Sequence, residues 1–235
     1  MRGCPSQSIR RTALRTAIIC AAIAVSAGAA RGEQQALQVD RAQQQDERLA
    51  YHYRIEHARY GDIGTYVNIV THRGNDTQVD SEMHVVVKML GITMFRQEAR
   101  RTEYWRGNRL ASFHGTTITN GTKIEVSGEA QGSDFAISNG KDRIVAPGNV
   151  HPSNPWSMMV LDTDAVMSTK TGEVFKAQVL GSNVQPINFD ARTEHLRGFE
   201  IVDDKREFVW FDERGVPIAF RAFEDGAQID FVLTR

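Results

Sequence analysis

The seven histidines of the 235-residue chain are the first residues to test for metal chemistry. His52 and His57 lie five residues apart in a segment of two-residue periodicity, so their side chains point to opposite faces of a strand. His52 and Glu56 share a face, but a zinc site needs three or four converging ligands. The other histidines stand singly: His72, His84, His114, His151 and His195. The sequence therefore predicts no metal site.

Hydroxyl and carboxylate groups offer acid–base or nucleophilic chemistry. Hydroxyl side chains flank His114, namely Ser112, Thr116 and Thr117, but no Gly-x-Ser-x-Gly elbow surrounds them. Carboxylates gather at presumed turns: Asp162, Asp164, Asp203, Asp204, Asp212 and Glu213. Acid–base catalysis needs one shielded and one solvated carboxylate, whereas turn carboxylates are solvated. We therefore predict no catalytic residue. A hydrolase that uses His151 or His114 with a turn carboxylate is kept only as a third hypothesis, after the two given below.

The first thirty-two residues have the order of a secretory signal peptide. Arginines precede an apolar stretch over 16–25, and small residues over 26–30 supply a cleavage site. The apolar run is shorter than the roughly twenty residues that span a bilayer, which disfavours a retained anchor. Arg10-Arg11 leaves twin-arginine export open beside the general route. The protein is expected to be periplasmic or secreted after cleavage of 1–32.

Composition removes several classes of function. Both cysteines, Cys4 and Cys20, lie in the predicted signal, so the mature chain has no thiol for disulfides, catalysis or metal ligation. Lys plus Arg is 28 and Asp plus Glu is 29, without a basic block for nucleic acid or a polybasic membrane patch. The 19 glycines fall singly at turns rather than in phosphate loops. We expect no nucleic-acid partner and no cofactor.

The remaining chain divides into a polar linker over 33–49 and one β domain over 50–235. The linker is rich in Gln and charge and has little to bury. Beyond it, apolar residues alternate with polar ones, as in the runs 82–89, 123–127 and 228–234. Such alternation places one set of side chains on a buried face and the other in water.

Turn signals separate these runs and set the fold. Asn120-Gly121, Asn139-Gly140 and Asp225-Gly226 favour the positive φ angles of tight hairpins. Short hairpins join antiparallel neighbours, so we predict an all-β, mainly antiparallel fold. It is a single curved meander sheet or half-open β-barrel of about ten to thirteen strands, because so long a sheet curls. One short helix is expected near 154–167.

Apolar residues provide the candidate ligand-binding set, which is Trp105, Trp156, Trp210, Phe211, Met89 and Met94. These side chains either pack as an ordinary core or line a hollow that accepts an acyl chain or another apolar ligand. Methionine suits a hollow because its flexible side chain re-packs around ligands of varied shape. The strand around 208–211 is apolar on both faces and should be covered on both sides.

Motifs along the chain resemble an uncharacterised family of exported bacterial β-proteins, the domain of unknown function 6134. In the second half they are His151-Pro152 leading to Trp156, Asp162-Thr163, Thr171-Gly172-Glu173-Val174, Trp210-Phe211-Asp212 with Gly215, and the segment 223–229. In the first half they are Ile63-Gly64 and Glu103-Tyr104-Trp105 with Leu110. One departure is the segment after His151: the family has a more compact His–Trp pair, and Pro152 and Pro155 interrupt it in this chain. The resemblance spans about 51–233 and implies a curved sheet around an apolar hollow, distantly like periplasmic lipoprotein carriers.

Three functions are thus weighed. The leading one is a periplasmic, non-enzymatic protein that binds or carries a hydrophobic, lipid-like ligand in the curved sheet. The alternative is an envelope interaction or assembly factor that binds a protein partner through a sheet edge or the polar linker. The hydrolase comes third. The resemblance carries over no activity, substrate or catalytic residue.

Overall fold

The computed structural model of the chain describes residues 47–189, 192–202, 206–224 and 226–234. The predicted signal peptide, 1–32, and most of the predicted linker lie outside the described residues. The first strand begins at Glu47, inside the last three residues of the predicted linker. Leu49 packs against a hydrophobic core cluster, and this contact explains why the sheet begins before residue 50, the predicted start of the β domain.

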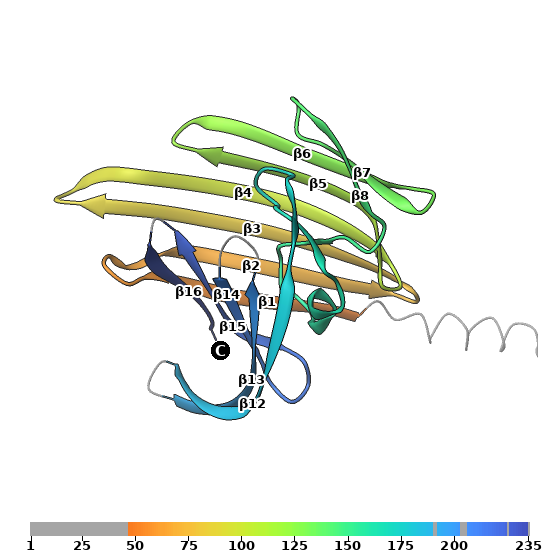
Figure 1. Cartoon of the computed structure of the whole chain (residues 1–235). Helices are drawn as coiled ribbons and strands as arrows, with labels where there is room; N and C mark the ends of the chain where they lie inside the picture. Colours follow the sequence, from red (N-terminus) through yellow and green to blue (C-terminus); the bar gives the residue numbers. More distant parts are fainter. Residues whose placement is uncertain (1–46, 190–191, 203–205, 225, 235) are drawn as a thin grey trace, which may run out of the picture. The chain divides into compact units, whose positions relative to one another are not determined.

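Thirteen strands form one antiparallel sheet, in the order β12-β13-β14-β15-β16-β1-β2-β3-β4-β5-β6-β7-β8 (Figure 1). In chain order they are β1 (Glu47–His57), β2 (Gly61–Arg73), β3 (Asp76–Met89), β4 (Ile92–Arg106), β5 (Arg109–Thr119), β6 (Thr122–Gln131), β7 (Asp134–Ser138), β8 (Arg143–Pro147), β12 (Gln178–Phe189), β13 (Arg192–Val202), β14 (Arg206–Phe211), β15 (Pro217–Glu224) and β16 (Ala227–Leu233). The predicted all-β meander is confirmed.

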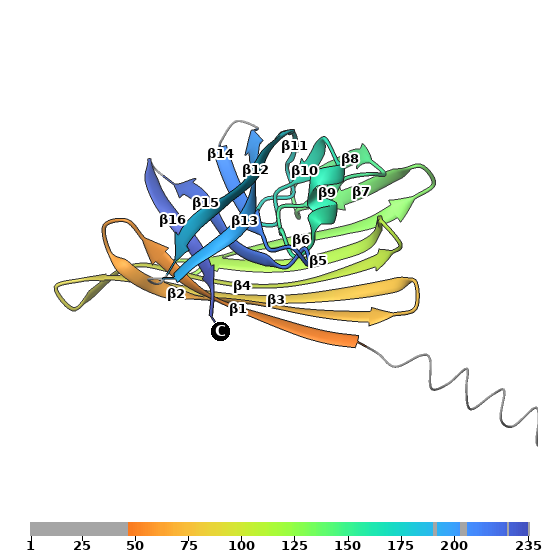
Figure 2. The ribbon, with the colours of Figure 1, turned by 90° about the horizontal axis from the view of Figure 1, so that it is seen from below.

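The strands of this sheet that come first and last in the chain, β1 and β16, pair with each other. β1 lies antiparallel to β16, with Tyr53 opposite Leu233 and His57 opposite Ile229. This pairing joins the meander β1–β8 to the meander β12–β16, while β8 and β12 remain the two edges. The sheet curls instead of lying flat (Figures 1 and 2), as expected from the accumulated twist of many strands.

The stretch between the two meanders forms a small second layer, here called the plug (residues 150–177). It contains β9 (His151–Pro152), β10 (Ala165–Met167) and β11 (Val174–Lys176), which form a three-stranded sheet, and the 3-10 helix η1 (Met158–Asp162). The expected helix near 154–167 is therefore present as one short 3-10 turn. Ser157 caps it, because its Oγ accepts a hydrogen bond from the amide of Met159 at 3.3 Å.

The described residues form four hydrophobic clusters, and two of them join the plug to the sheet. The first joins the plug to strands β1 to β8 and includes Trp105, Trp156 and Met167. A second cluster lies on strands β1 to β4, β15 and β16 and has no member from the plug. The last two flank β14: Phe211 belongs to one and Trp210 to the other. The predicted covering of this strand on both faces is confirmed.

Candidate binding site on the inner face of the sheet

A fully buried carboxylate lies where the plug meets the sheet. Glu103 is on β4, on the same strand face as Trp105, and its residue is inaccessible to solvent. Its Oε2 accepts hydrogen bonds from the indole Nε1 atoms of Trp105 at 2.9 Å and Trp156 at 3.2 Å. Its Oε1 accepts from Asn154 Nδ2 at 2.8 Å. Three donors thus compensate in part for the loss of hydration.

Asn154 extends this network to two further strands. Its Oδ1 accepts from Tyr66 Oη at 2.8 Å and from Asn68 Nδ2 at 3.0 Å. Its Nδ2 also approaches Ser81 Oγ at 3.2 Å. In its ionised form Glu103 accepts and does not donate, so it then requires the amide nitrogen of Asn154, and the amide oxygen turns toward Tyr66 and Asn68. The single side chain of Asn154 therefore ties the plug to β2, β3 and β4.

Burial shifts the pKa values of two ionisable groups where the plug meets the sheet, Glu103 on β4 and His151 on β9. Desolvation raises the pKa of Glu103 to about 7, against the opposing effect of its three hydrogen-bond donors and the cationic Arg101. Desolvation lowers the pKa of His151, although hydrogen bonds with the backbone of Asn108 and Met159 and the charge of Asp162 act in the other direction. Near neutral pH the site therefore holds a carboxyl that exchanges its proton and an imidazole that favours its neutral form.

Two buried nitrogen atoms at this site have no hydrogen-bond partner. One is Nδ1 of His151, whose ring meets Trp105 edge to face at a centroid distance of 4.9 Å. The other is Nε of Arg101, which lies two residues before Glu103 on the same face of β4. Buried donors and acceptors are nearly always paired in proteins, so these two atoms are candidates for contact with a bound group.

The space beside these groups is small. A cavity of about 10 Å³ is lined by Trp105, His151, Pro152, Asn154, Trp156, Ser157, Met159 and Val160. That volume is close to the minimum for one water molecule. Any larger molecule at Glu103 or His151 requires the plug to move.

The structure separates the six residues of the predicted binding set. Trp105 and Trp156 come together, with ring centroids 5.9 Å apart, and both donate to the same carboxylate. Trp210 packs instead in the cluster of Ile218 and Leu196, stacked on Phe208 at 5.9 Å. Phe211 is buried with the η1 side of the plug.

The structure places Met89 and Met94 outside the four hydrophobic clusters, away from the other four residues of the set. Both are about half exposed at the tip of the β3–β4 hairpin. The register opposes Val87 to Phe95 and Lys88 to Thr93, which leaves Met94 as an extra residue in a bulge. A bulge breaks the two-residue alternation that the sequence pattern assumed.

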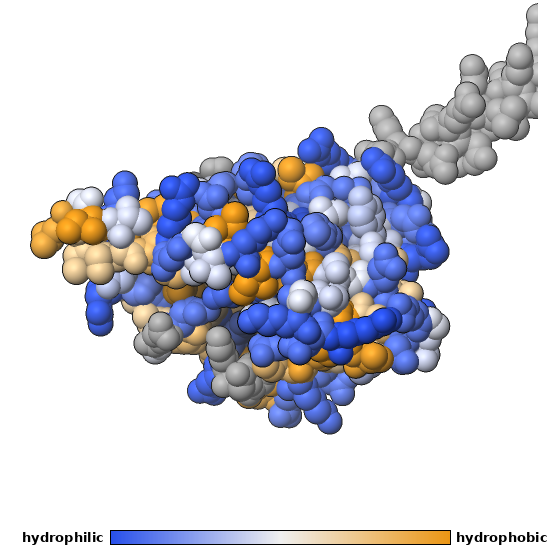
Figure 3. Space-filling model, turned by 90° about the horizontal axis from the view of Figure 1, so that it is seen from above, coloured by the Kyte–Doolittle hydropathy of each residue, from blue (hydrophilic) through white to orange (hydrophobic). Residues whose placement is uncertain are grey.

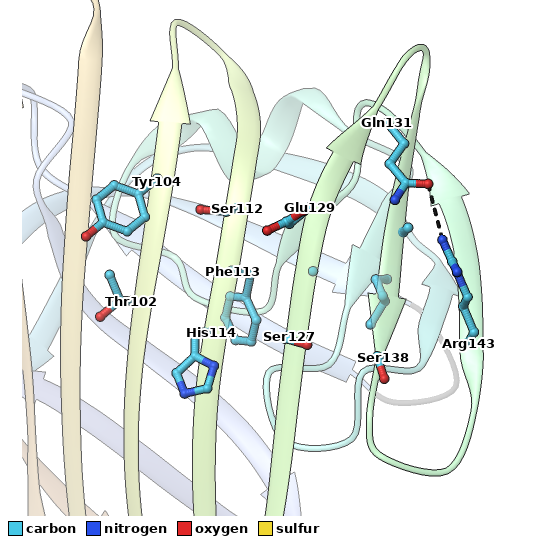
Figure 4. A pocket seen from close by; sticks show the side chains of 13 residues that line it. Thr102, Tyr104, Ser112, Phe113, His114, Ser127, Glu129, Gln131, Ser138 and Arg143 are labelled. Carbon is cyan, nitrogen blue, oxygen red and sulfur yellow. Dashed lines mark hydrogen bonds between the residues drawn. The ribbon is translucent and has the colours of Figure 1, made fainter.

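A larger hollow, of about 480 Å³, lies over the other face of strands β4 to β8 (Figure 4). Its polar lining includes Tyr104, His114, Glu129 and Arg143, and Arg143 donates to Gln131 at 3.4 Å. His114, one of the two histidines of the hydrolase hypothesis, is exposed here. Thr102 and Ser127 are its register neighbours on the adjacent strands.

The groups required by the hydrolase hypothesis are not joined. Nδ1 of His151 has no partner, and no hydrogen bond links this ring to a carboxylate among the described residues. Within the same ranges, no three His, Cys, Asp or Glu side chains converge to hold a metal ion. Asp203 and Asp204 lie outside the described residues.

Helices able to cross a membrane are absent from the part of the chain that the structure describes.

Sequence reasoning missed the central residues of this site, Glu103 and Asn154. One signal was available: Glu103 stands at an inward position of an alternating strand, between Arg101 and Trp105. A carboxylate at such a position requires buried donors. Nothing in the sequence indicated that Asn154, 51 residues later, supplies one.

Comparison with known proteins places this architecture in a family. The family model described as "Domain of unknown function (DUF6134)" matches residues 53–234. The chain belongs to this family. The match contains every residue of the Glu103 network, and it confirms the resemblance read from the motifs. No curated protein matches the chain.

A solved structure shares the fold of this DUF6134 member. It is the "Beta-barrel-like Protein of Domain of Unknown Function DUF1849 from Brucella abortus", with a TM-score of 0.59. The match covers 79% of this chain and 95% of that one at 10% sequence identity. At that identity the likeness concerns the fold alone, which is a barrel-like curved sheet.

Proposed function

We propose that this DUF6134 protein acts in the periplasm, after export directed by residues 1–32, and binds an apolar or amphiphilic, lipid-like small molecule without transforming it. One observation carries this proposal. The plug covers only part of the inner face of the sheet, and no apolar plug residue belongs to the cluster on β1 to β4, β15 and β16.

The side chains of that cluster suit an apolar ligand. Phe220 and Phe231 stack at a centroid distance of 4.3 Å, and Tyr66 meets both rings edge on at 5.9 Å. Phe95 and Leu233 are only partly buried against the cluster. Partly exposed apolar side chains beside a rigid aromatic group provide contact area for an acyl chain.

Polar groups lie at one boundary of the cluster. Tyr66 belongs to the cluster and donates to Asn154, the plug residue that donates to Glu103. Nε of Arg101 on β4 and Nδ1 of His151, whose ring meets Trp105, have no hydrogen-bond partner. An amphiphile would place its apolar part on the cluster and its polar end toward these buried nitrogen atoms, which requires the plug to move because the cavity beside His151 holds only about 10 Å³.

Native mass spectrometry of the protein purified from its own envelope tests this function. A bound small molecule that extraction with organic solvent removes is the expected result. Saturable binding of a long-chain fatty acid by the extracted protein, with altered Trp105 and Trp156 fluorescence, is expected as well. A clean mass without ligand, together with no saturable binding of the fatty acid, would overturn the proposal.

A matched pair of variants locates the binding surface. F95S removes a partly buried ring from the inner cluster, whereas I118S removes an exposed side chain from a neighbouring strand. Both should give the wild-type circular dichroism spectrum, and only F95S should lower ligand occupancy. Cell fractionation tests the location: processed protein in the periplasmic fraction is expected, and unprocessed protein in the cytosol contradicts it.

A second candidate is binding of a protein partner at a sheet edge. The two edge strands expose apolar side chains, Val145 on β8 and Leu180 and Val184 on β12. Unpaired edges with exposed apolar residues accept an added strand from a partner. V145K and L180K should abolish co-purification of such a partner and leave the small-molecule ligand bound.

A further inference from the structure

The tip of the β3–β4 hairpin is an exposed apolar projection. Leu90 at its apex is 97% exposed, and Ile92, Met94 and Met89 are 66%, 55% and 50% exposed. β3 and β4 are the longest strands of the sheet, with 14 and 15 residues, and their shared end extends beyond the neighbouring strands (Figures 1 and 2). An apolar patch marks this protruding end at the left of Figure 3.

The turn at the apex uses an unfavourable residue. Leu90 and Gly91 have φ angles of 53° and 81°, the pattern of a two-residue hairpin turn with both central residues left-handed. The β5–β6 hairpin has the same geometry, with Asn120 at 49° and Gly121 at 87°. Asn adopts this backbone at low energetic cost and Leu at a higher one. A leucine at position 90 is therefore unfavourable in two respects, its left-handed backbone and the exposure of its apolar side chain to water. A contact of this side chain outside the chain would account for both.

Other exposed apolar side chains lie at the same end of the sheet. In an antiparallel meander, the turns β1–β2, β3–β4 and β5–β6 share one end. Tyr60 is in the first of these turns, and Ile118 lies two residues before the third. With the four hairpin residues, six of the ten exposed large hydrophobic side chains among the described residues gather there.

We infer that the β3–β4 tip inserts into the surface of a phospholipid bilayer and docks the protein there. Full burial of one such side chain removes on the order of 100 Å² from water, so the partly exposed four offer roughly 300 Å². A stable protein interface needs about 800 Å² from each partner. A narrow convex tip meets that requirement poorly, whereas a bilayer accepts a few aliphatic side chains at any point of its surface.

The chemistry of the tip indicates insertion and not electrostatic attraction. Lys88 is its single charged residue between positions 88 and 94, and it lies at the base. Amphipathic lysine at that depth can place its ammonium among the head groups while its stem remains in apolar surroundings. Binding should therefore depend weakly on salt and should not require anionic lipid.

Flotation with vesicles of phosphatidylethanolamine, with and without phosphatidylglycerol, tests this inference on the purified full chain. The wild type should float with both, and L90N should lower the partition coefficient at least about tenfold, the loss expected from one buried leucine. V145N, which removes an apolar side chain that is 67% exposed on the β8 edge, should bind as the wild type does. Equal flotation of L90N and wild type, or no flotation of the wild type, would overturn the inference.

A photo-crosslinking amino acid in place of Leu90 distinguishes lipid from protein in the envelope. Adducts with phospholipid support the inference, and adducts with protein alone overturn it. Circular dichroism establishes that each variant folds. L90N should retain the small molecule proposed above for the inner cluster, because that cluster has no member at the apex. The docking inference and the proposed ligand binding can therefore fail independently.

Discussion

Asn154 Nδ2 donates a hydrogen bond to Glu103 Oε1 over 2.8 Å, and this bond joins the plug to β4 of the sheet. The two residues are 51 positions apart in the sequence, and both are buried. Together with the Trp156–Glu103 bond and the shared hydrophobic cluster, it fixes the position of the plug on the inner face. Several measurable properties follow from it and from its surroundings.

N154L should destabilise the protein by about 2–4 kcal/mol. The substitution leaves Glu103 without one of its three donors and leaves Tyr66 without its acceptor, and both groups stay buried. Urea unfolding followed by tryptophan fluorescence measures the change. N108L, at an exposed turn position, is the control and should change stability by less than about 0.5 kcal/mol. Equal effects of the two would mean that the network contributes nothing.

Glu103 should make the protein less stable as the pH rises toward neutrality. Its pKa is raised from 4.5 to about 7, so between these values the folded state binds one more proton than the unfolded state. The free energy of unfolding therefore falls by roughly 3 kcal/mol across that interval and is constant above it. E103Q should lack this component, which appears as the difference between wild-type and variant urea profiles at each pH. The exposed E129Q should keep the wild-type profile.

His151 should make the protein less stable as the pH falls, the opposite of the effect of Glu103. Burial lowers its pKa below 6.5, so below that value the unfolded state gains a proton that the folded state resists. H151F removes this loss and the unpartnered Nδ1 while keeping a ring beside Trp105. At pH 7 we expect the variant to equal the wild type or exceed it by about 1 kcal/mol. A loss of stability instead would show that the backbone hydrogen bonds of His151 with Asn108 and Met159 contribute more than the unpartnered Nδ1 costs.

Gly64 should not tolerate a side chain. A Cβ there would lie 1.9 Å from the backbone carbonyl oxygen of His84, the preceding neighbour of its register partner Val85. Backbone atoms cannot rotate away, so G64A should cost roughly 3 kcal/mol or lower the yield of folded protein. G181A is the matched control, because its nearest contact would be an ordinary 3.4 Å from Phe199. Thermal unfolding of the pair measures the difference.

Exchanging Leu and Asn in the two left-handed hairpin turns should change the free energy of unfolding in opposite directions. L90N places a favoured residue at φ 53° and should raise the free energy of unfolding by about 1 kcal/mol. N120L makes the opposite change at φ 49° and should lower it by a similar amount, with loss of the bond that Asn120 Oδ1 accepts from the Arg96 amide. Denaturant titration checks both signs. A loss of stability in L90N would show that Leu90 packs within the fold.

Local patterns in the sequence were sufficient for much of the architecture. Alternation over 82–89 identified β3, and Asn120-Gly121 identified a hairpin turn at its observed position. These features depend on neighbouring residues only, because side-chain alternation and turn geometry are properties of short backbone segments. The all-β class, the meander and the short helical turn were predictable for that reason.

Other features depend on residues far apart in the chain. The pairing of β1 with β16, the position of the plug and the meeting of Asn154 with Glu103 follow from how the curled sheet closes on its contents. The bulge that exposes Met94 depends on the register between β3 and β4. The sequence by itself determined the alternating strand segments of the two meanders and the hairpin turns between them. Only the tertiary structure decided which inward groups meet, because burial and hydrogen-bond partners depend on the whole fold.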